Sequence, residues 1–160
     1  MYAVDNADIA FFAKEIVKKN DKRGVIKVIK GKIEDCKEIP DNSIDVIISE
    51  WMGYFLLYES MLDSIIDVRD KYLKKGGTVF PNKAQIFVAA IDDEQFYSYK
   101  VGHWKNVYGF DMSCLSNAVL REAQIDFVDG GKNVISNESL ILDLNLNTMK
   151  KEDVNFASKY

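Results

Sequence analysis

The chain has 160 residues, of which 48% are hydrophobic and 29% charged, a composition typical of a globular protein and unlike that of a disordered or fibrous one. Its 21 basic and 25 acidic residues give a formal net charge of −4, which gives no electrostatic reason to expect nucleic acid as the main partner and slightly favours cationic partners. Cys36 and Cys114 lie far apart and form no metal-binding or disulfide pattern, and no apolar window approaches the roughly 20 residues that span a bilayer. With no signal-peptide pattern at the start, we expect an intracellular protein without a metal site.

The first half of the chain alternates strand and helix patterns. Residues 2–5 (YAVD) are compatible with a strand, and Asn6 to Asp8 offer helix N-cap chemistry before an apolar helical pattern in residues 9–20. Residues 25–31 and 44–50 are β-branched strands, and the second is apolar enough to be buried on both faces. This order predicts an α/β fold with a parallel sheet.

The pattern changes in the second half. Residues 60–77 predict a helix that ends at Gly76 and Gly77. Beyond Pro81, residues 84–92 and 139–148 show the short alternating runs of antiparallel sheet, separated by an aromatic-rich stretch. We therefore predict one domain over residues 1–80 and a second over residues 81–160, with the boundary near residues 80–83.

Two acidic residues follow the predicted parallel strands. Asp5 ends the first strand and Glu34 follows the second by three residues, so both approach the carboxyl edge where α/β sheets bind ligands. An acid at such a strand end can accept hydrogen bonds from ribose hydroxyls. On the residues alone, the alternatives of a helix-starting aspartate and a solvated loop glutamate stay open.

The segment SEWMGYFLLYES, residues 49–60, places Glu50 and Glu59 at the two ends of an aromatic loop. Two carboxylates about 4 Å apart repel by a few kcal/mol at an effective dielectric near 20, so a cation must offset the repulsion or one carboxylate must be protonated. A guanidinium, with its planar fork of donors, can pair with both. The alternative is that one glutamate caps a helix, the other is solvated, and the loop aromatics are core: Trp51, Tyr54, Phe55 and Tyr58.

These segments resemble those of one family. SEWMGYFLLYESM closely resembles the double-E loop of the protein arginine N-methyltransferases, YAVD their ribose-binding strand end, GKIED their adenine-contacting segment, and HWKNVYGFDMSC part of their dimerisation arm. The chain looks closest to the type I members, which make asymmetric dimethylarginine. The resemblance implies a partial Rossmann-like S-adenosylmethionine-dependent methyltransferase domain over residues 1–80. It also implies the start of an antiparallel β-barrel over residues 81–160, with a helical dimerisation arm at about residues 93–115.

The resemblance also implies roles for single residues. Asp5 would hold the ribose of S-adenosylmethionine, although glutamate is commoner there in the family, and Glu34 with the backbone of Ile33 would contact the adenine. Glu50 and Glu59 would be catalytic and clamp the substrate guanidinium. Met61 would line the substrate pocket, against the alternative that it is a core methionine on an amphipathic helix.

The implied partners are arginine-containing protein substrates, such as glycine- and arginine-rich or histone tails, and a second copy of the chain bound through the arm. The implied location is the nucleus and cytoplasm, with neither direct nucleic-acid binding nor a membrane.

Against the family pattern, the glycine-rich cofactor loop and most of the barrel are absent, so we expect an incomplete fragment that folds poorly by itself. The alternative function is a catalytically silent dimerisation or scaffold fragment. A small-molecule methyltransferase would share the cofactor but would not be expected to keep both Glu50 and Glu59.

Overall fold

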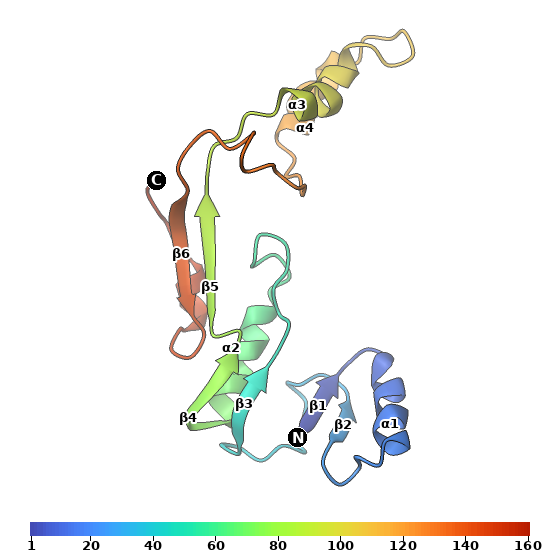
Figure 1. Cartoon of the computed structure of the whole chain (residues 1–160), viewed down its shortest axis with the longest axis vertical. Coiled ribbons are helices and arrows are strands. Elements are labelled where there is room, and N and C mark those ends of the chain that lie inside the picture. The colour runs from blue at the N-terminus through green and yellow to red at the C-terminus, as the bar shows by residue number, and fades with distance from the viewer. The chain divides into compact units, whose positions relative to one another are not determined.

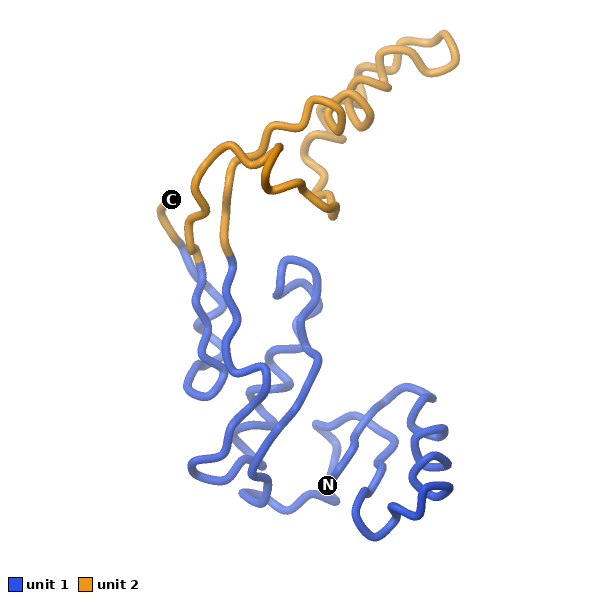
Figure 2. Tube along the Cα trace, viewed as in Figure 1, with its two compact units in different colours: residues 1–86, 142–157 blue, residues 87–141, 158–160 orange.

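The computed structural model describes all 160 residues, which form two compact units (Figures 1 and 2). Unit 1 comprises Met1–Ile86 and Leu142–Ala157, and unit 2 comprises Phe87–Ile141 and Ser158–Tyr160. These units follow spatial packing, whereas the predicted domains at 1–80 and 81–160 follow the change in sequence pattern, so the predicted division stays a prediction. No helix is long and apolar enough to span a membrane.

The first βαβ element of unit 1 agrees with the prediction. Strand β1 (Tyr2–Asp5) pairs in parallel with β2 (Lys27–Lys30), and helix α1 (Ile9–Lys19) connects them. The register places Asp5 beside Lys30, so both strands end at the same edge. Only Ala10 of α1 is buried, and the apolar side chains Ile9, Phe11, Phe12 and Ile16 are each more than half exposed. The helix therefore forms as its apolar periodicity predicts, but most of that face is uncovered.

The second βαβ element corrects the prediction for residues 60–77. Helix α2 (Met61–Tyr72) stops before the glycines, and strand β4 (Leu73–Phe80) begins at the next residue and pairs in parallel with β3 (Ile44–Ile48). Gly76 and Gly77 lie inside β4, where the register shifts between Ile44 and Val46. Gly76 has a left-handed φ of 83°, and a Cβ on Gly77 would lie 2.8 Å from the carbonyl oxygen of Asp45. The glycines therefore permit an irregular, close strand pairing rather than ending the helix.

The expectation that residues 44–50 are buried on both faces is wrong. Val46 is 47% exposed and Ile48 is 81% exposed. The reason is that β3 pairs with β4 alone, because β1–β2 and β3–β4 form separate two-stranded sheets. The arrows of the four strands point the same way in Figure 1, so their carboxyl ends face a common side of unit 1.

One apolar cluster joins the two βαβ elements. Its buried members come from β2, the following loop and α2: Ile29, Cys36, Ile39, Val68 and Tyr72. Four partly buried residues pack against the cluster: Val4, Ile33, Ile44 and Ile47. The strands β1 and β3, the loop after β2 and helix α2, which carry or adjoin the predicted site residues, therefore share this core. The Tyr72 hydroxyl donates to the carbonyl oxygen of Cys36 at 2.7 Å, which satisfies the polar end of a ring that is 2% exposed.

Strands β5 (Lys83–Val88) and β6 (Ser139–Asn145) form the third two-stranded sheet. It is antiparallel, since the amide of Leu146 donates to Asn82 and the amide of Ile135 donates to Ala90. The structure contains this pair and no closed barrel. The predicted start of a barrel is therefore represented by one antiparallel pair.

The chain after β6 is bound tightly to the α/β part of unit 1. Arg69, 9% exposed on α2, donates from Nη1 to the carbonyl oxygens of Leu146 and Met149, both at 2.8 Å. Asn147 Oδ1 accepts from the amide of Val79 at 3.0 Å, and Lys151, the first residue of the 3-10 helix η3 (Lys151–Val154), pairs with Asp67 at 2.6 Å. Residues 146–151 are thus fixed against α2 and β4.

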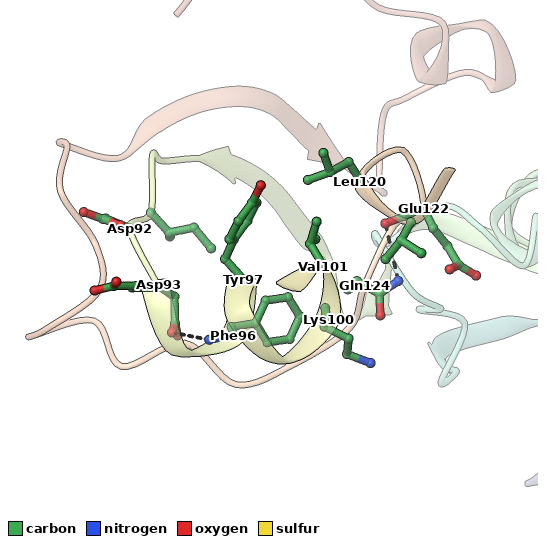
Figure 3. A pocket seen from close by; sticks show the side chains of 12 residues that line it. Asp92, Asp93, Phe96, Tyr97, Lys100, Val101, Leu120, Glu122 and Gln124 are labelled. Atoms are coloured by element: carbon green, nitrogen blue, oxygen red, sulfur yellow. Dashed lines mark hydrogen bonds between the residues drawn. The ribbon is translucent and has the colours of Figure 1, made fainter. Parts of the chain in front are cut away.

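Unit 2 contains short helices: α3 (Glu94–Lys100), η1 (Gly102–Lys105), η2 (Ser113–Leu115) and α4 (Ser116–Leu120). Asp93 caps α3 by accepting from the amide of Phe96 at 2.9 Å, as Figure 3 shows. An open pocket of about 830 Å³ lies between residues 91–101 and 119–124. Most of the arm's aromatic residues stay exposed: Tyr97, Tyr99, Tyr108 and Phe110.

Candidate functional site

Asp5 occupies the predicted place at the carboxyl end of β1. Its side chain is exposed, and Oδ1 accepts from the amide of Ala7 at 2.6 Å. Of Asn6 to Asp8, which offered N-cap chemistry, Asp8 takes the N-cap position of α1 but makes no side-chain capping bond, and the turn before the helix is held by Asp5. A ribose hydroxyl would therefore find Oδ2 available and Oδ1 already shared with the backbone.

Glu34 is held toward helix α2. The Ser64 hydroxyl donates a hydrogen bond to Glu34 Oε1. This bond, followed by one from the backbone amide of Glu34, lowers the pKa of the Glu34 carboxyl below its ordinary value. Ile33 next to it packs on the central apolar cluster. Glu34 is therefore an acceptor whose orientation is set by Ser64.

The loop between β3 and α2 has an unusual backbone. Phe55, Leu56 and Ser60 all have φ between 50° and 60°, in the left-handed region that non-glycine residues rarely adopt. Trp51 is 1% exposed, and its indole N–H has no hydrogen-bond partner. The alternative that all the loop aromatics are core is wrong for three of them: Tyr54, Phe55 and Tyr58 are 61 to 80% exposed. The loop is therefore a surface element fixed at one end by Trp51.

Glu50 and Glu59 are both exposed on this loop. Glu50 lies two residues beyond the end of β3, while Glu59 immediately precedes Ser60 and helix α2. The Glu59 side chain folds back over Gly53, because a Cβ built on Gly53 would lie 2.7 Å from Glu59 Cγ and 3.0 Å from Cδ. Neither carboxylate takes part in an ion pair of the chain. Neither charge is therefore neutralised within the chain.

Met61, the first residue of α2, is 43% exposed and so is not a core methionine. Ser64 lies three residues further along the same helix and therefore on a neighbouring part of its surface. Through Ser64, the structure brings Glu34 to the helix that begins beside Glu59.

Sequence reasoning missed three residues. Ser64 could have been found from its helical spacing to Met61, and Arg69 from its place among the apolar positions of α2, where a buried charge needs partners. Gly53 carried no signal, because its close approach to Glu59 depends on the path of the loop.

The acceptors present have the chemistry to accept from the donor groups of a nucleoside and of a guanidinium. Asp5 and Glu34 follow neighbouring parallel strands, where hydroxyl and amino groups of a nucleoside can be bound. The loop carboxylates can bind the planar donors of a guanidinium. No group of three or more His, Cys, Asp or Glu residues is placed to hold a metal ion.

Comparisons with known proteins identify relatives of the chain. Residues 82–160 match the family described as the arginine methyltransferase oligomerization subdomain. All 160 residues are 46% identical to protein arginine N-methyltransferase 1 of Schizosaccharomyces pombe and 43% identical to protein arginine N-methyltransferase 8-B of Danio rerio. The chain covers 46% and 38% of those two proteins, so it spans less than half the length of these curated relatives.

Solved structures of arginine methyltransferases are also similar to this chain. A chain of the Trypanosoma brucei PRMT1 enzyme–prozyme heterotetrameric complex with AdoHcy superposes with a TM-score of 0.87 at 38% identity, over 97% of this chain and 48% of that one. Arabidopsis thaliana protein arginine methyltransferase 10 superposes with a TM-score of 0.74 at 30% identity, over 96% of this chain and 49% of that one.

Proposed function

The chain belongs to the protein arginine N-methyltransferase family, and from that premise we propose that it forms part of an enzyme that transfers methyl groups from S-adenosylmethionine to arginine guanidinium nitrogens in proteins. One observation carries the proposal. Glu50 and Glu59 are exposed and lack cation partners on a loop that directly follows parallel strand β3. A cationic substrate at this loop would neutralise the otherwise unpaired charges.

The residues available for the cofactor are Asp5, Ile33 and Glu34. Asp5 Oδ2 would accept from a ribose hydroxyl, and Glu34, oriented by Ser64, would accept from the adenine amino group, beside the backbone of Ile33. Bound S-adenosylmethionine would supply an electrophilic methyl group on a sulfonium cation. The two strand-end carboxylates therefore account for the nucleoside part of the cofactor.

The loop carboxylates would act on the substrate. The guanidinium and the methyl donor are both cations, and Glu50 and Glu59 would offset their repulsion while orienting one terminal nitrogen. Methyl transfer would form an N–C bond at the expense of the C–S bond of the sulfonium, and the nitrogen would lose one proton to water, so the methylated guanidinium would keep a single positive charge. Arginine does not deprotonate by itself near neutral pH, so proton loss would accompany or follow transfer. A solvent isotope effect in single turnovers would show the order, and rate-limiting deprotonation before transfer would contradict it.

We also propose the finer properties that the resemblance implies. The product would be asymmetric dimethylarginine, with Met61 at the start of α2 limiting how methyl groups fit. The substrates would be glycine- and arginine-rich or histone tails in the nucleus and cytoplasm. Mass spectrometry of such peptides after reaction tests the product, and finding symmetric dimethylarginine would contradict it. Imaging a tagged chain tests the location, and exclusion from both compartments would contradict it.

Self-association through unit 2 is part of the proposal. The match of residues 82–160 to an oligomerization subdomain supports it, as do the exposed arm aromatics. In a second copy, α1 offers a suitable surface, since Phe12 and Ile16 are exposed and Lys18 and Lys19 lie in the last turn of the helix. The pocket of unit 2 complements it with mainly acidic charged residues: Asp92, Asp93, Glu94 and Glu122, against Lys100 (Figure 3).

The direct test uses the chain and a chimera in which the remaining parts of the S. pombe relative are joined to it. Both are titrated calorimetrically with S-adenosylhomocysteine and assayed for methylation of an arginine-rich peptide. We expect the chimera to bind and methylate. Glu50→Gln and Glu59→Gln should each lower turnover by about 100- to 1,000-fold, to a residual but measurable rate, and keep cofactor binding, whereas Asp5→Ala and Glu34→Ala should weaken binding.

The second candidate is a catalytically silent dimerisation or scaffold module, which the oligomerization-subdomain match favours for the 160 residues alone. If the chain and the chimera both self-associate but neither binds S-adenosylhomocysteine, the result would support the scaffold function and contradict the proposed enzyme activity. If methyl transfer keeps the wild-type rate in both the Glu50→Gln and the Glu59→Gln variant, the proposed role of the two carboxylates would be refuted.

A further inference from the structure

Resting on the proposed function, we infer that Gly53 is the positioning residue for the Glu59 carboxylate, and that the loop needs a position without a side chain there. Gly53 lies near the start of the loop, six residues before Glu59. Its amide donates to the carbonyl oxygen of Leu56 at 3.2 Å, and the two residues form an isolated antiparallel bridge. This bridge turns the loop back on itself.

The turn brings the Glu59 side chain onto the Gly53 backbone. A Cβ at Gly53 would lie 2.7, 3.0 and 3.1 Å from the Cγ, Cδ and Cβ atoms of Glu59. Bonded carbons aside, carbon atoms pack at about 3.5 to 4.0 Å, so the first distance is too short for any side chain to coexist with Glu59 in this position. The overlap involves Cγ and Cβ as well as the carboxyl carbon. Rotation of the terminal carboxylate alone therefore cannot relieve it.

The backbone cannot easily relieve it either. Gly53 is held through Leu56, and Phe55 and Leu56 are both in the left-handed region. Glu59 is followed by Ser60, also left-handed, and then by α2, which is fixed by six buried residues. The side chain of Glu59 is exposed, so it is the part that would move. A methyl group at Gly53 should therefore displace the carboxylate and leave the fold intact.

The φ of Gly53 does not itself require glycine, since it lies outside the left-handed region. The requirement arises from the space that Glu59 occupies. This distinguishes Gly53 from Gly31, Gly76 and Gly109, whose positive φ values restrict the residue type for backbone reasons.

The test compares Gly53→Ala with Gly24→Ala, in whichever form of the protein methylates. Gly24 is the matched control, because a Cβ there meets no atom within 4 Å and its φ is unrestricted. We expect Gly53→Ala to lower kcat by about 10- to 100-fold, the scale for a misplaced reacting group. Its S-adenosylhomocysteine Kd should stay within about twofold of the wild type, as should that of Gly24→Ala.

A double-mutant cycle separates positioning from a general structural effect. If Gly53 acts through Glu59, adding Gly53→Ala to Glu59→Gln should cause no further loss of activity. An equal loss in both backgrounds, or no loss in either, would overturn the inference.

A readout without turnover keeps the inference separate from the proposed function. In the 160-residue chain or the chimera labelled with ¹³C-glutamate, Gly53→Ala should shift the resonance of the Glu59 side-chain carboxyl carbon, and Gly24→Ala should not. Glu59→Gln serves to assign that resonance. An unmoved resonance would refute the positioning role. A shifted resonance in a protein that never methylates would support Gly53 and contradict only the proposed enzyme activity.

Discussion

Replacing Arg69 by methionine tests what holds the chain after β6 against α2. Methionine fills a similar volume but cannot donate, so the carbonyl oxygens of Leu146 and Met149 would lose their Nη1 partner. Both residues are 5% exposed or less, so water would not readily replace the donor. Hydrogen bonds to a charged group contribute about 1.5 to 3 kcal/mol each. Two of them predict a loss of about 3 to 6 kcal/mol in the free energy of unfolding.

The ion pair of Arg69 with Asp70 adds little to this value. It is 2.7 Å long, but the Asp70 side chain is 62% exposed, and exposed pairs contribute about 0 to 1 kcal/mol. Lys74→Met is the matched control, because Lys74 pairs at 2.8 Å with Asp45 and both side chains are exposed. It should cost no more than about 1 kcal/mol.

Urea unfolding followed by the fluorescence of Trp51 measures the difference. Trp51 is 1% exposed in unit 1, and Trp104 is replaced by phenylalanine in every variant so that one tryptophan reports. At a slope of about 2 kcal/mol/M, Arg69→Met should lower the midpoint by about 1.5 to 3 M and Lys74→Met by about 0.5 M or less. Equal midpoint changes in the two variants would show that the bonds to the carbonyls make no net contribution. The assay applies to the isolated chain if it folds and otherwise to the chimera.

Three further predictions concern other contacts. Ser64→Ala should raise the lowered pKa of Glu34 toward 4.5. The wild type should then be the more stable protein above about pH 4.5, and this advantage should disappear as the pH falls through the folded-state pKa of Glu34. Urea midpoints measured from pH 3 to 7 test this, and an advantage that persists unchanged at pH 3 would contradict it. Gly77→Ala should destabilise the protein by about 1 to 3 kcal/mol through the contact with the Asp45 carbonyl oxygen, whereas Gly24→Ala should be neutral. Thermal unfolding of both variants measures this. Equal melting temperatures would show that β3 and β4 can separate without cost. Tyr108 in the arm is 98% exposed, so Tyr108→Ser should shift sedimentation velocity profiles toward the monomer. The far-ultraviolet circular dichroism spectrum should not change. An unchanged sedimentation profile would remove this residue from the proposed contact.

The parallel pairs and the positions of the strand-end acids could be predicted because each depends on local pattern. Apolar runs separated by an amphipathic helix indicate βαβ units, and an acid at a strand end then lies at the ligand edge. Strand β4 could not be predicted from its own residues, since Lys74 to Gly77 show no alternation and the strand depends on pairing with β3. The exposure of Ile48 was missed for a related reason, because it depends on which strands lie beside β3.

The site shows the same limit. Glu50 and Glu59 could be selected by their chemistry, but the contact of Glu59 with Gly53 depends on successive backbone angles that propensities do not specify. Ser64 lies between these cases: its helical position was predictable, whereas its partner Glu34 lies 30 residues away.

The left-handed backbone at Phe55, Leu56 and Ser60 has a consequence for engineering the protein. Each such non-glycine residue costs about 1 to 3 kcal/mol, and glycine or asparagine would relieve part of that cost. A library selected only for heat resistance should therefore accumulate those two residues in this loop. Under the proposed function, a library selected for turnover should disfavour glycine there, because its greater backbone freedom would let the loop depart from the conformation that presents Glu59. Under the proposed function, the two selections would diverge at these three positions, where thermal tolerance and turnover favour different residues.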